Sequence, residues 1–162
     1  MPPRLSTLLP GFMLALAALS ARAAAEVEVR FIEPAKFTDI KSNSLTEESL
    51  FATLRQHLQT LGQKYLGDAQ RLEIEVTDLD LAGSIEYPPQ TQPLRVLRDV
   101  TGPRITLRWR LAAPGTSTAL QEVTLRDTAY LSRINHYAEG DPLRYEKLLL
   151  ETWLRSAFVP AK

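Results

Sequence analysis

The sequence predicts an α+β fold, a two-layer sandwich in which a mixed sheet of four to five strands carries two helices on one face. Several short segments alternate apolar and polar residues, so each expected strand has one face for the core and one for water. Two longer segments repeat apolar residues at three- and four-residue steps, which is typical of amphipathic helices. Because one sheet face is polar, we expect both helices to cover the other, apolar face. The expected order of elements along the chain is β-α-β-β-β-α.

Two alternating segments predict the first two strands. Residues Val27–Phe31 alternate until Pro34 ends the pattern, and residues Leu72–Val76 alternate in the same way. The apolar phase then shifts near Asp78, which predicts a β-bulge or a strand end there. Because a helical segment separates the two strands, we expect a right-handed crossover that leaves them parallel.

The helix between these strands has an expected start and an expected end. The segment Ser44–Glu47 fits a capping box, which satisfies free amide groups at a helix start. Gly62 predicts a stop after about Leu61. The apolar face of this helix would consist of Leu50, Phe51, Leu54, Leu58 and Leu61.

The second half of the chain predicts a long loop followed by a hairpin. Residues 83–103 contain four prolines and would form a loop, with a short strand at Leu94–Leu97. The clearest strand of the sequence is Arg104–Leu111, and a turn at Pro114 leads to a returning strand at Val123–Leu125.

A last helix completes the expected fold. Asp141 is a suitable N-cap and Pro142 a suitable first helical residue, so we expect this helix from Pro142 to about Phe158. Its buried face would consist of Leu143, Leu150, Trp153, Leu154, Ala157 and Phe158.

The N-terminal 25 residues have the composition of a cleavable signal peptide. They carry two arginines and no acidic residue, and an uncharged apolar run at Leu8–Leu19 precedes a group of small residues. We expect cleavage after Ala25, with cleavage after Ala23 as the fallback. The alternative is a membrane anchor, but the apolar run is shorter than the roughly 20 residues that a span needs. The leader therefore predicts export from the cytoplasm.

Composition limits what the remaining chain can be. Removing residues 1–25 from the 162-residue chain leaves 137 residues, enough for a single domain at 26–162. The leader takes two of the 19 basic and none of the 19 acidic residues, so the net charge becomes −2. This balance gives no basic surface for nucleic acid or for anionic membranes, and no later segment is apolar enough to span a bilayer. The chain has no cysteine, which excludes disulfides and thiolate chemistry.

Charged and phenolic residues at segment ends form the one candidate site. Asp78 and Asp80 lie two residues apart, where a strand would place them on one face, although two carboxylates are too few for a cation. Arg104, Arg108 and Arg110 form a basic row that either binds an anion or pairs with glutamates of the neighbouring strands. A ligand or partner groove between the long loop and the last helix would use Asp78, Asp80, Arg98, Asp99, Arg104, Asp127, Tyr130 and Tyr145. The alternative is a structural network that pins the loop to the hairpin and the helix.

Six short blocks are together typical of one protein family. They are Phe31–Asp39, Asp78–Gly83, Arg95–Val96 with Asp99, Pro103–Ile105, Tyr145–Lys147 and Trp153. In order and approximate spacing they resemble the proteobacterial exported proteins catalogued as domain of unknown function 3016. The first block is less acidic than the form associated with that family. The resemblance implies a small soluble domain in a Gram-negative periplasm, and it implies no activity and no catalytic residues.

These observations favour a non-enzymatic binding domain of the cell envelope. The sequence contains no zinc helix, nucleophile elbow, Walker loop or dinucleotide fingerprint, so we assign no catalytic residue, cofactor or metal site. One alternative is a hydrolase or metal-dependent enzyme that uses Asp78, Asp80, Asp99 and His136. Another is a structural protein that self-associates through its first strand. The ligand or partner would be an unidentified small molecule or envelope protein.

Overall fold

Five strands form one mixed sheet in the computed structural model, which describes residues 24–159. The strand order is β1-β2-β5, with β6 and β7 both pairing with β5. Most of the expected leader, including the fallback cleavage residue Ala23, lies outside the described residues. The bounds of the five strands are Glu26–Phe31 for β1, Arg71–Asp80 for β2, Arg104–Ala113 for β5, Thr116–Ser117 for β6 and Gln121–Arg126 for β7.

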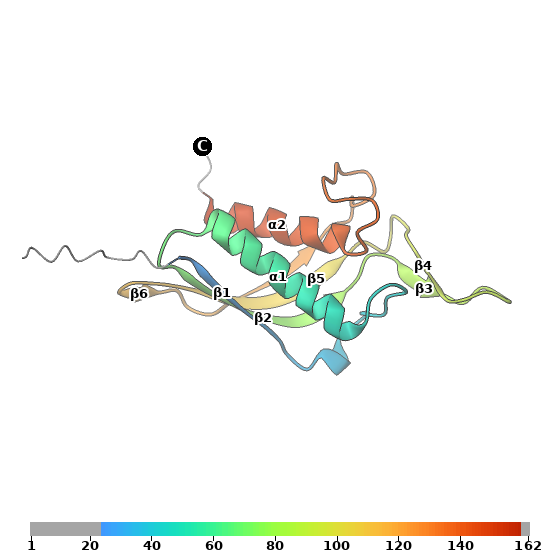
Figure 1. The fold of residues 1–162 in the computed structure, drawn as a ribbon, viewed down its shortest axis with the longest axis horizontal. Helices are drawn as coiled ribbons and strands as arrows, with labels where there is room; N and C mark the ends of the chain where they lie inside the picture. The colour runs from blue at the N-terminus through green and yellow to red at the C-terminus, as the bar shows by residue number, and fades with distance from the viewer. Residues whose placement is uncertain (1–23, 160–162) are drawn as a thin grey trace, which may run out of the picture.

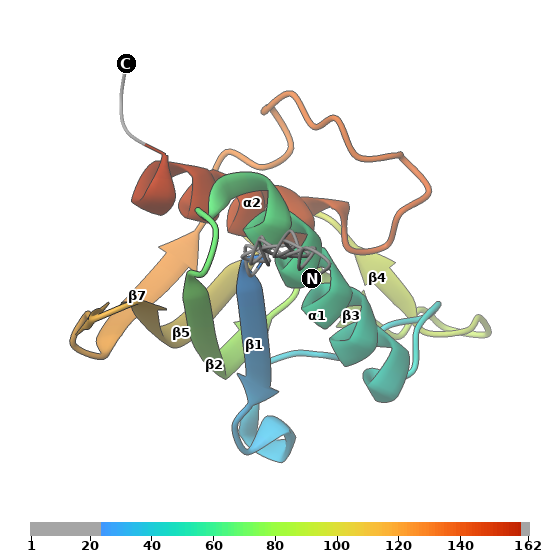
Figure 2. The same ribbon diagram turned by 60° about the vertical axis from the view of Figure 1, so that its left-hand side comes forward.

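Two helices, α1 (Glu47–Tyr65) and α2 (Arg144–Phe158), lie beside each other over the sheet (Figure 1). The turned view shows both helices on the same side of the strands (Figure 2). The predicted two-layer α+β sandwich, with its helices on one face, is therefore confirmed. In the described part of the chain, neither helix combines the length and hydrophobicity that a membrane span requires.

The strand pairing follows the alternation in the sequence. β1 pairs with β2 in parallel, as expected for a strand-helix-strand unit, and β1 lies at the edge of the sheet. β2 pairs with β5, and β5 with β7, in antiparallel fashion. The register of β2 against β5 shifts between Val76 and Asp78, which confirms the predicted bulge. The shift allows β2 to continue to Asp80 although its apolar parity changes.

The two faces of the sheet have opposite characters. On the polar face Glu73 lies opposite Arg110 and Glu75 opposite Arg108, and both pairs form salt bridges. The predicted cross-strand pairing of the basic row is thus confirmed for these two arginines. The apolar face and the two helices enclose a core that includes Leu50, Leu54, Leu58, Leu72, Ile74, Val76, Ile105, Leu107, Leu150 and Leu154.

A separate two-stranded hairpin interrupts the connection from β2 to β5. It consists of β3 (Ser84–Glu86) and β4 (Leu94–Val96), and it lies at the end of the molecule where α1 begins (Figure 1). The short strand predicted at Leu94–Leu97 therefore exists, but it pairs with β3 instead of joining the main sheet. A short 3₁₀ turn, η1 (Pro34–Lys36), follows β1 where the proline was expected to end the strand.

The predicted limits of α1 are wrong at both ends. Thr46 is the N-cap, and its side-chain oxygen accepts a hydrogen bond from the amide of Ser49 at 3.2 Å, so the capping box does not begin at Ser44. The helix also continues through Gly62 to Tyr65. Gly62 allows α1 and β1 to pack closely, because a Cβ at this position would lie only 2.1 Å from Cγ2 of Val27.

The predicted start of α2 is two residues early. The Asp141 carboxylate accepts a hydrogen bond from the amide of Leu143 at 2.9 Å, which forms a turn before the helix begins at Arg144. Pro142 lies in this turn and outside the helix. Ala157 is exposed and does not belong to the buried face, whereas Phe158 in the same turn packs edge-on against Trp109 of β5, with ring centroids 5.2 Å apart.

We expect Gly62→Ala to destabilise the protein by about 1–3 kcal/mol, because the added methyl group clashes with Val27 in a packed interface. This is the reverse of the usual effect of alanine in a helix interior. Urea unfolding of both proteins measures the difference, and Gln63→Ala, at an exposed position of the same turn, is the matched control. An unchanged or higher unfolding free energy for Gly62→Ala would contradict the packing.

Candidate functional site

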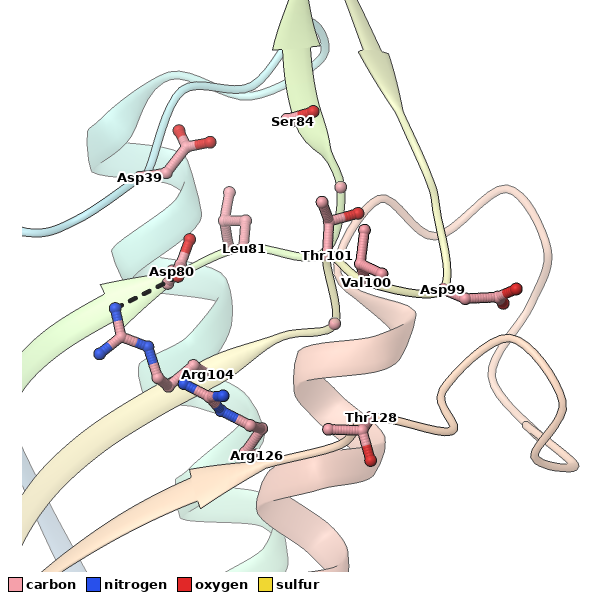
Figure 3. A pocket seen from close by; sticks show the side chains of 12 residues that line it. Asp39, Asp80, Leu81, Ser84, Asp99, Val100, Thr101, Arg104, Arg126 and Thr128 are labelled. Carbon is pink, nitrogen blue, oxygen red and sulfur yellow. Dashed lines mark hydrogen bonds and ion pairs between the residues drawn. The ribbon is translucent and has the colours of Figure 1, made fainter.

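The end of β2, the start of β5 and the end of β7 meet around a cavity of about 520 Å³, which we call the end-of-sheet cavity. Figure 3 shows its walls, to which the segment between β4 and β5 also contributes. Three of the predicted site residues line it, namely Asp80, Asp99 and Arg104. The other lining residues are Asp39, Leu81, Gly83, Ser84, Val100, Thr101, Gly102, Arg126 and Thr128.

The predicted carboxylate pair is already engaged by other groups. Asp78 accepts hydrogen bonds from the amide and the hydroxyl of Thr38, at 2.8 and 2.9 Å. One guanidinium nitrogen of Arg104 lies 3.3 Å from a carboxylate oxygen of Asp78 and 3.3 Å from one of Asp80. Both carboxylates therefore share one arginine, which neutralises part of their charge and holds β2 to the start of β5.

Arg95 on β4 connects the hairpin to the end of the main sheet. Its Nη1 donates to the carbonyl oxygens of residues 81–83 at 3.3, 3.0 and 3.0 Å. Its Nη2 donates to Asp39 Oδ2 at 2.9 Å and to the carbonyl oxygen of Lys41. The planar guanidinium can satisfy several acceptors at once, so a single side chain fixes the hairpin against two other segments.

Two glycines allow the walls of the cavity to approach closely. Gly83 has a positive φ of 82°, and an added Cβ would lie 2.6 Å from the carbonyl oxygen of Val96. A Cβ on Gly102 would lie 2.1 Å from the carbonyl oxygen of Asp127. The amide of Gly83 also donates to the carbonyl oxygen of Thr101 at 2.8 Å. Only residues without a side chain fit at these two positions.

The remaining predicted residues lie outside the end-of-sheet cavity. The hydroxyl of buried Tyr130 donates to the carbonyl oxygen of Arg98 at 2.9 Å, and its ring stacks edge-on against Tyr145 with centroids 4.8 Å apart. The Asp127 carboxylate accepts from the amide of Ala129 at 3.0 Å. These contacts join the long loop to α2 and to the turn after β7.

A second groove, of about 300 Å³, separates β4 from the start of α2 and is lined in part by Tyr145, Leu94 and Leu97. Glu146 is 1% exposed, and it accepts a hydrogen bond from the amide of Ala82 at 2.7 Å. Burial raises the pKa of Glu146, and the bond from Ala82 offsets only part of that effect.

Glu151 is the centre of a polar cluster that the sequence analysis missed. Its carboxylate accepts hydrogen bonds from the hydroxyls of Tyr65 and Tyr137 at 2.6 and 2.7 Å and from Lys64 at 2.9 Å. His136 Nε2 lies 3.0 Å from the same carboxylate. Burial alone would raise the pKa of Glu151, but the bonds from Tyr65, Tyr137 and Lys64 outweigh it and lower the pKa to about 2. This cluster joins α1, α2 and the loop before α2.

The four residues of the enzyme alternative do not come together. His136 contacts Glu151 among the helices, whereas Asp78 and Asp80 bind Arg104 at the sheet. The carboxylate of Asp99 points away from the other labelled side chains of the cavity (Figure 3). Across residues 24–159, no group of three or more His, Cys, Asp or Glu side chains could hold a metal ion.

Sequence signals for the missed residues differ in strength. Glu146 lies at helical spacing between Leu143 and Leu150, so its phase already placed a carboxylate in the apolar stripe of the last helix. Arg95 left no such signal, because most of its partners are main-chain carbonyl oxygens. Arg126 reaches the cavity because of the register between β5 and β7. The alternation of apolar and polar residues along each strand does not determine that register, so the sequence carries no signal for it.

The fold and the cavity define a two-layer α+β domain with a cavity at one end of its sheet that is lined by both charged and apolar residues. The family model described as "Protein of unknown function (DUF3016)" matches residues 25–156, so the chain belongs to this family, and the resemblance inferred from the sequence blocks is confirmed. No curated protein matches the chain.

Two solved structures are similar at low identity. A Xanthomonas campestris protein of the DUF330 family is 10% identical, with a TM-score of 0.40 over 85% of this chain and 82% of that chain. A minor lipoprotein from Acinetobacter baumannii is 12% identical, with a TM-score of 0.28 over 85% of this chain and 90% of that chain.

We expect Glu151→Gln to lower the unfolding free energy at neutral pH by up to about 3 kcal/mol, since the folded pKa lies well below the usual value. A depressed pKa stabilises the fold above the unfolded value of 4.5, and this contribution is lost as the pH falls toward about 2. Urea unfolding at pH 7, 4 and 2.5 should therefore show a narrowing gap between the two proteins. Glu139→Gln, at an exposed loop position, is the control; a gap that does not depend on pH would refute the assignment.

Proposed function

We propose that the chain is an exported protein of the Gram-negative cell envelope, cleaved after Ala25 and active in the periplasm as the domain 26–162. The basic start, the apolar run and the small residues before Glu26 support export. The match to the family begins at residue 25, and the first strand begins at Glu26. Cleavage after Ala25 would thus remove the leader without cutting into the folded domain.

The domain acts by binding a small ligand or a partner protein in the end-of-sheet cavity, without catalysis. The observation that carries this proposal is that the protein's own contacts hold the walls of the cavity in place. Arg95 fixes the hairpin, Gly83 bonds to Thr101, and Gly102 lies against the main chain of Asp127. A site that is ordered in advance loses less entropy on binding, which favours affinity. The ion pair of Asp80 with Arg104 supports binding over acid–base chemistry, because that carboxylate is already occupied.

The segment 83–103, from which Val100 reaches the cavity and Leu94 and Leu97 reach the second groove, supports a role in recognition. Large apolar side chains are exposed at eight positions of the described chain, and four of these belong to residues 83–103. Val100 lines the cavity itself and is 89% exposed. Exposed apolar side chains grouped on one segment are typical of interaction sites. The four residues of this segment are Tyr87, Leu94, Leu97 and Val100.

Export is tested by fractionating cells that produce the full chain and sequencing the N-terminus of the protein. We expect a periplasmic product that starts at Glu26. Replacing both Ala23 and Ala25 with lysine should leave the precursor uncut, because signal peptidase needs small side chains at these positions. Substitution of the exposed Ala52 by lysine on α1 is the control for added charge. Unprocessed wild-type protein in the cytosol would refute export.

Binding is tested by placing a photo-crosslinking amino acid at Val100, in the rim of the cavity, or at Gln59, an exposed position on α1. Irradiation of intact cells should yield an adduct from position 100 and none from position 59. Mass spectrometry of the adduct then distinguishes a small molecule from a protein. Equal labelling at the two positions, or no adduct at position 100, would count against the cavity as the binding site.

A further inference from the structure

Two arginines on neighbouring strands line the wall of the end-of-sheet cavity. Arg104 on β5 and Arg126 on β7 are direct cross-strand partners, and both side chains line the cavity (Figure 3). Like charges at opposite positions of two strands repel each other and destabilise the pair. By contrast, Arg108 lies opposite Glu122 on the same two strands. The arginine pair therefore needs negative charge from elsewhere.

The protein supplies that charge to only one of the two arginines. Arg104 lies 3.3 Å from carboxylate oxygens of both Asp78 and Asp80. The guanidinium of Arg126 makes no hydrogen bond and no ion pair with any residue between 24 and 159. Arg126, which is exposed, thus presents a guanidinium without a direct partner beside a second arginine.

Other charged groups of the cavity do not cancel Arg126. Asp39 is paired with Arg95 at 2.9 Å, and Asp80 is paired with Arg104. The carboxylate of Asp99 points away from the labelled side chains of the cavity (Figure 3). Asp78 and Asp80 share the single charge of Arg104, so the wall carries no net positive charge, and what Arg126 offers a ligand is a guanidinium whose donors have no partner among the described residues.

We propose that the end-of-sheet cavity binds a ligand through an oxyanion group, a carboxylate or a phosphate, seated on Arg126. This inference rests on the proposed binding function of the cavity and names the chemistry of its ligand. A guanidinium presents a planar fork of donors that matches both kinds of oxyanion. The negative group also relieves the repulsion between Arg104 and Arg126.

The size of the cavity indicates what carries the oxyanion. A volume of about 520 Å³ lies within the range of small-molecule sites and far exceeds a single carboxylate or phosphate. The rest of the ligand would face the hydroxyl of Ser84 and the main chain at Gly83 and Gly102. We therefore infer a polar organic molecule, or the end of a polar polymer, that carries a terminal oxyanion.

The main chain holds Arg126 in position before binding. Arg126 is the last residue of β7, and the amide of the following Asp127 donates to the carbonyl oxygen of Pro103 at 3.3 Å. Gly102 leaves no space between the loop and Asp127. Only the side chain of Arg126 has to be ordered when a ligand binds, which reduces the entropic cost.

The test uses the protein purified from the cell fraction in which it accumulates, with inorganic phosphate and sodium acetate as probes against chloride at equal ionic strength. We expect saturable NMR shifts of the Arg126 Nε–H and of the Gly102 amide with at least one probe. Arg126→Gln should weaken the binding at least about tenfold, since it removes a charge-assisted bond. Arg155→Gln, at an exposed position on α2, should bind as the wild type does. Higher affinity for phosphate than for acetate would indicate a phosphate ligand, and higher affinity for acetate would indicate a carboxylate ligand.

Stability without anions provides a second measurement. Arg126→Gln should melt at the same temperature as the wild type or higher at low ionic strength, because it removes the repulsion from Arg104. A lower melting temperature would mean that Arg126 has a structural role and would overturn the proposal. Equal affinities of the wild type and Arg126→Gln for both probes, or no saturable shift with either, would also overturn it. If photo-crosslinking at position 100 still succeeds in that case, the binding function stands and only the oxyanion chemistry fails.

Discussion

The guanidinium of Arg95 is the contact on which the functional end of this protein depends. It binds main-chain carbonyl oxygens that the end of the main sheet leaves free, and it pairs with Asp39 at 2.9 Å. Buried carbonyl groups need partners, because an unsatisfied group costs about 1–3 kcal/mol. Because Arg95 satisfies these carbonyl groups, its side chain fixes the position of the β3–β4 hairpin against the end of the main sheet. The start of this hairpin, at Ser84, forms part of the wall of the end-of-sheet cavity.

Charge on the sheet is arranged so that most groups are neutralised by a cross-strand partner. Along β2 and β5 the glutamates and arginines alternate in register, and each pair contributes on the order of 0.2–1 kcal/mol to the sheet. On β2 the pattern continues to the cavity, where Asp80 pairs with Arg104, but on the other side of β5 Arg104 faces Arg126. On the two strands that meet at the cavity, Arg104 has carboxylate partners and Arg126 has none among the described residues, which leaves a guanidinium free to bind a negative group.

Helix α2 carries two buried glutamates whose surroundings differ. Glu146 accepts one main-chain hydrogen bond, and burial raises its pKa, whereas Glu151 accepts bonds from two tyrosines and a lysine that lower its pKa to about 2. The number of donors decides which effect dominates, since burial alone disfavours the charged form of both groups. Glu146 therefore connects the helix to the end of β2, and Glu151 holds the loop that precedes α2.

From sequence alone it was possible to determine the class of fold, the elements of the sheet and the side of the sheet that the helices cover. These properties follow from periodicity, because an apolar stripe or face must be buried wherever it occurs. Part of the cavity was also predictable, since Asp80, Asp99 and Arg104 were selected at segment ends. The tertiary structure alone decided that Gly62 continues a helix, that Arg95 binds carbonyl oxygens and that Arg126 faces Arg104. These facts depend on register and on the close approach of distant segments, which no local pattern of residues encodes.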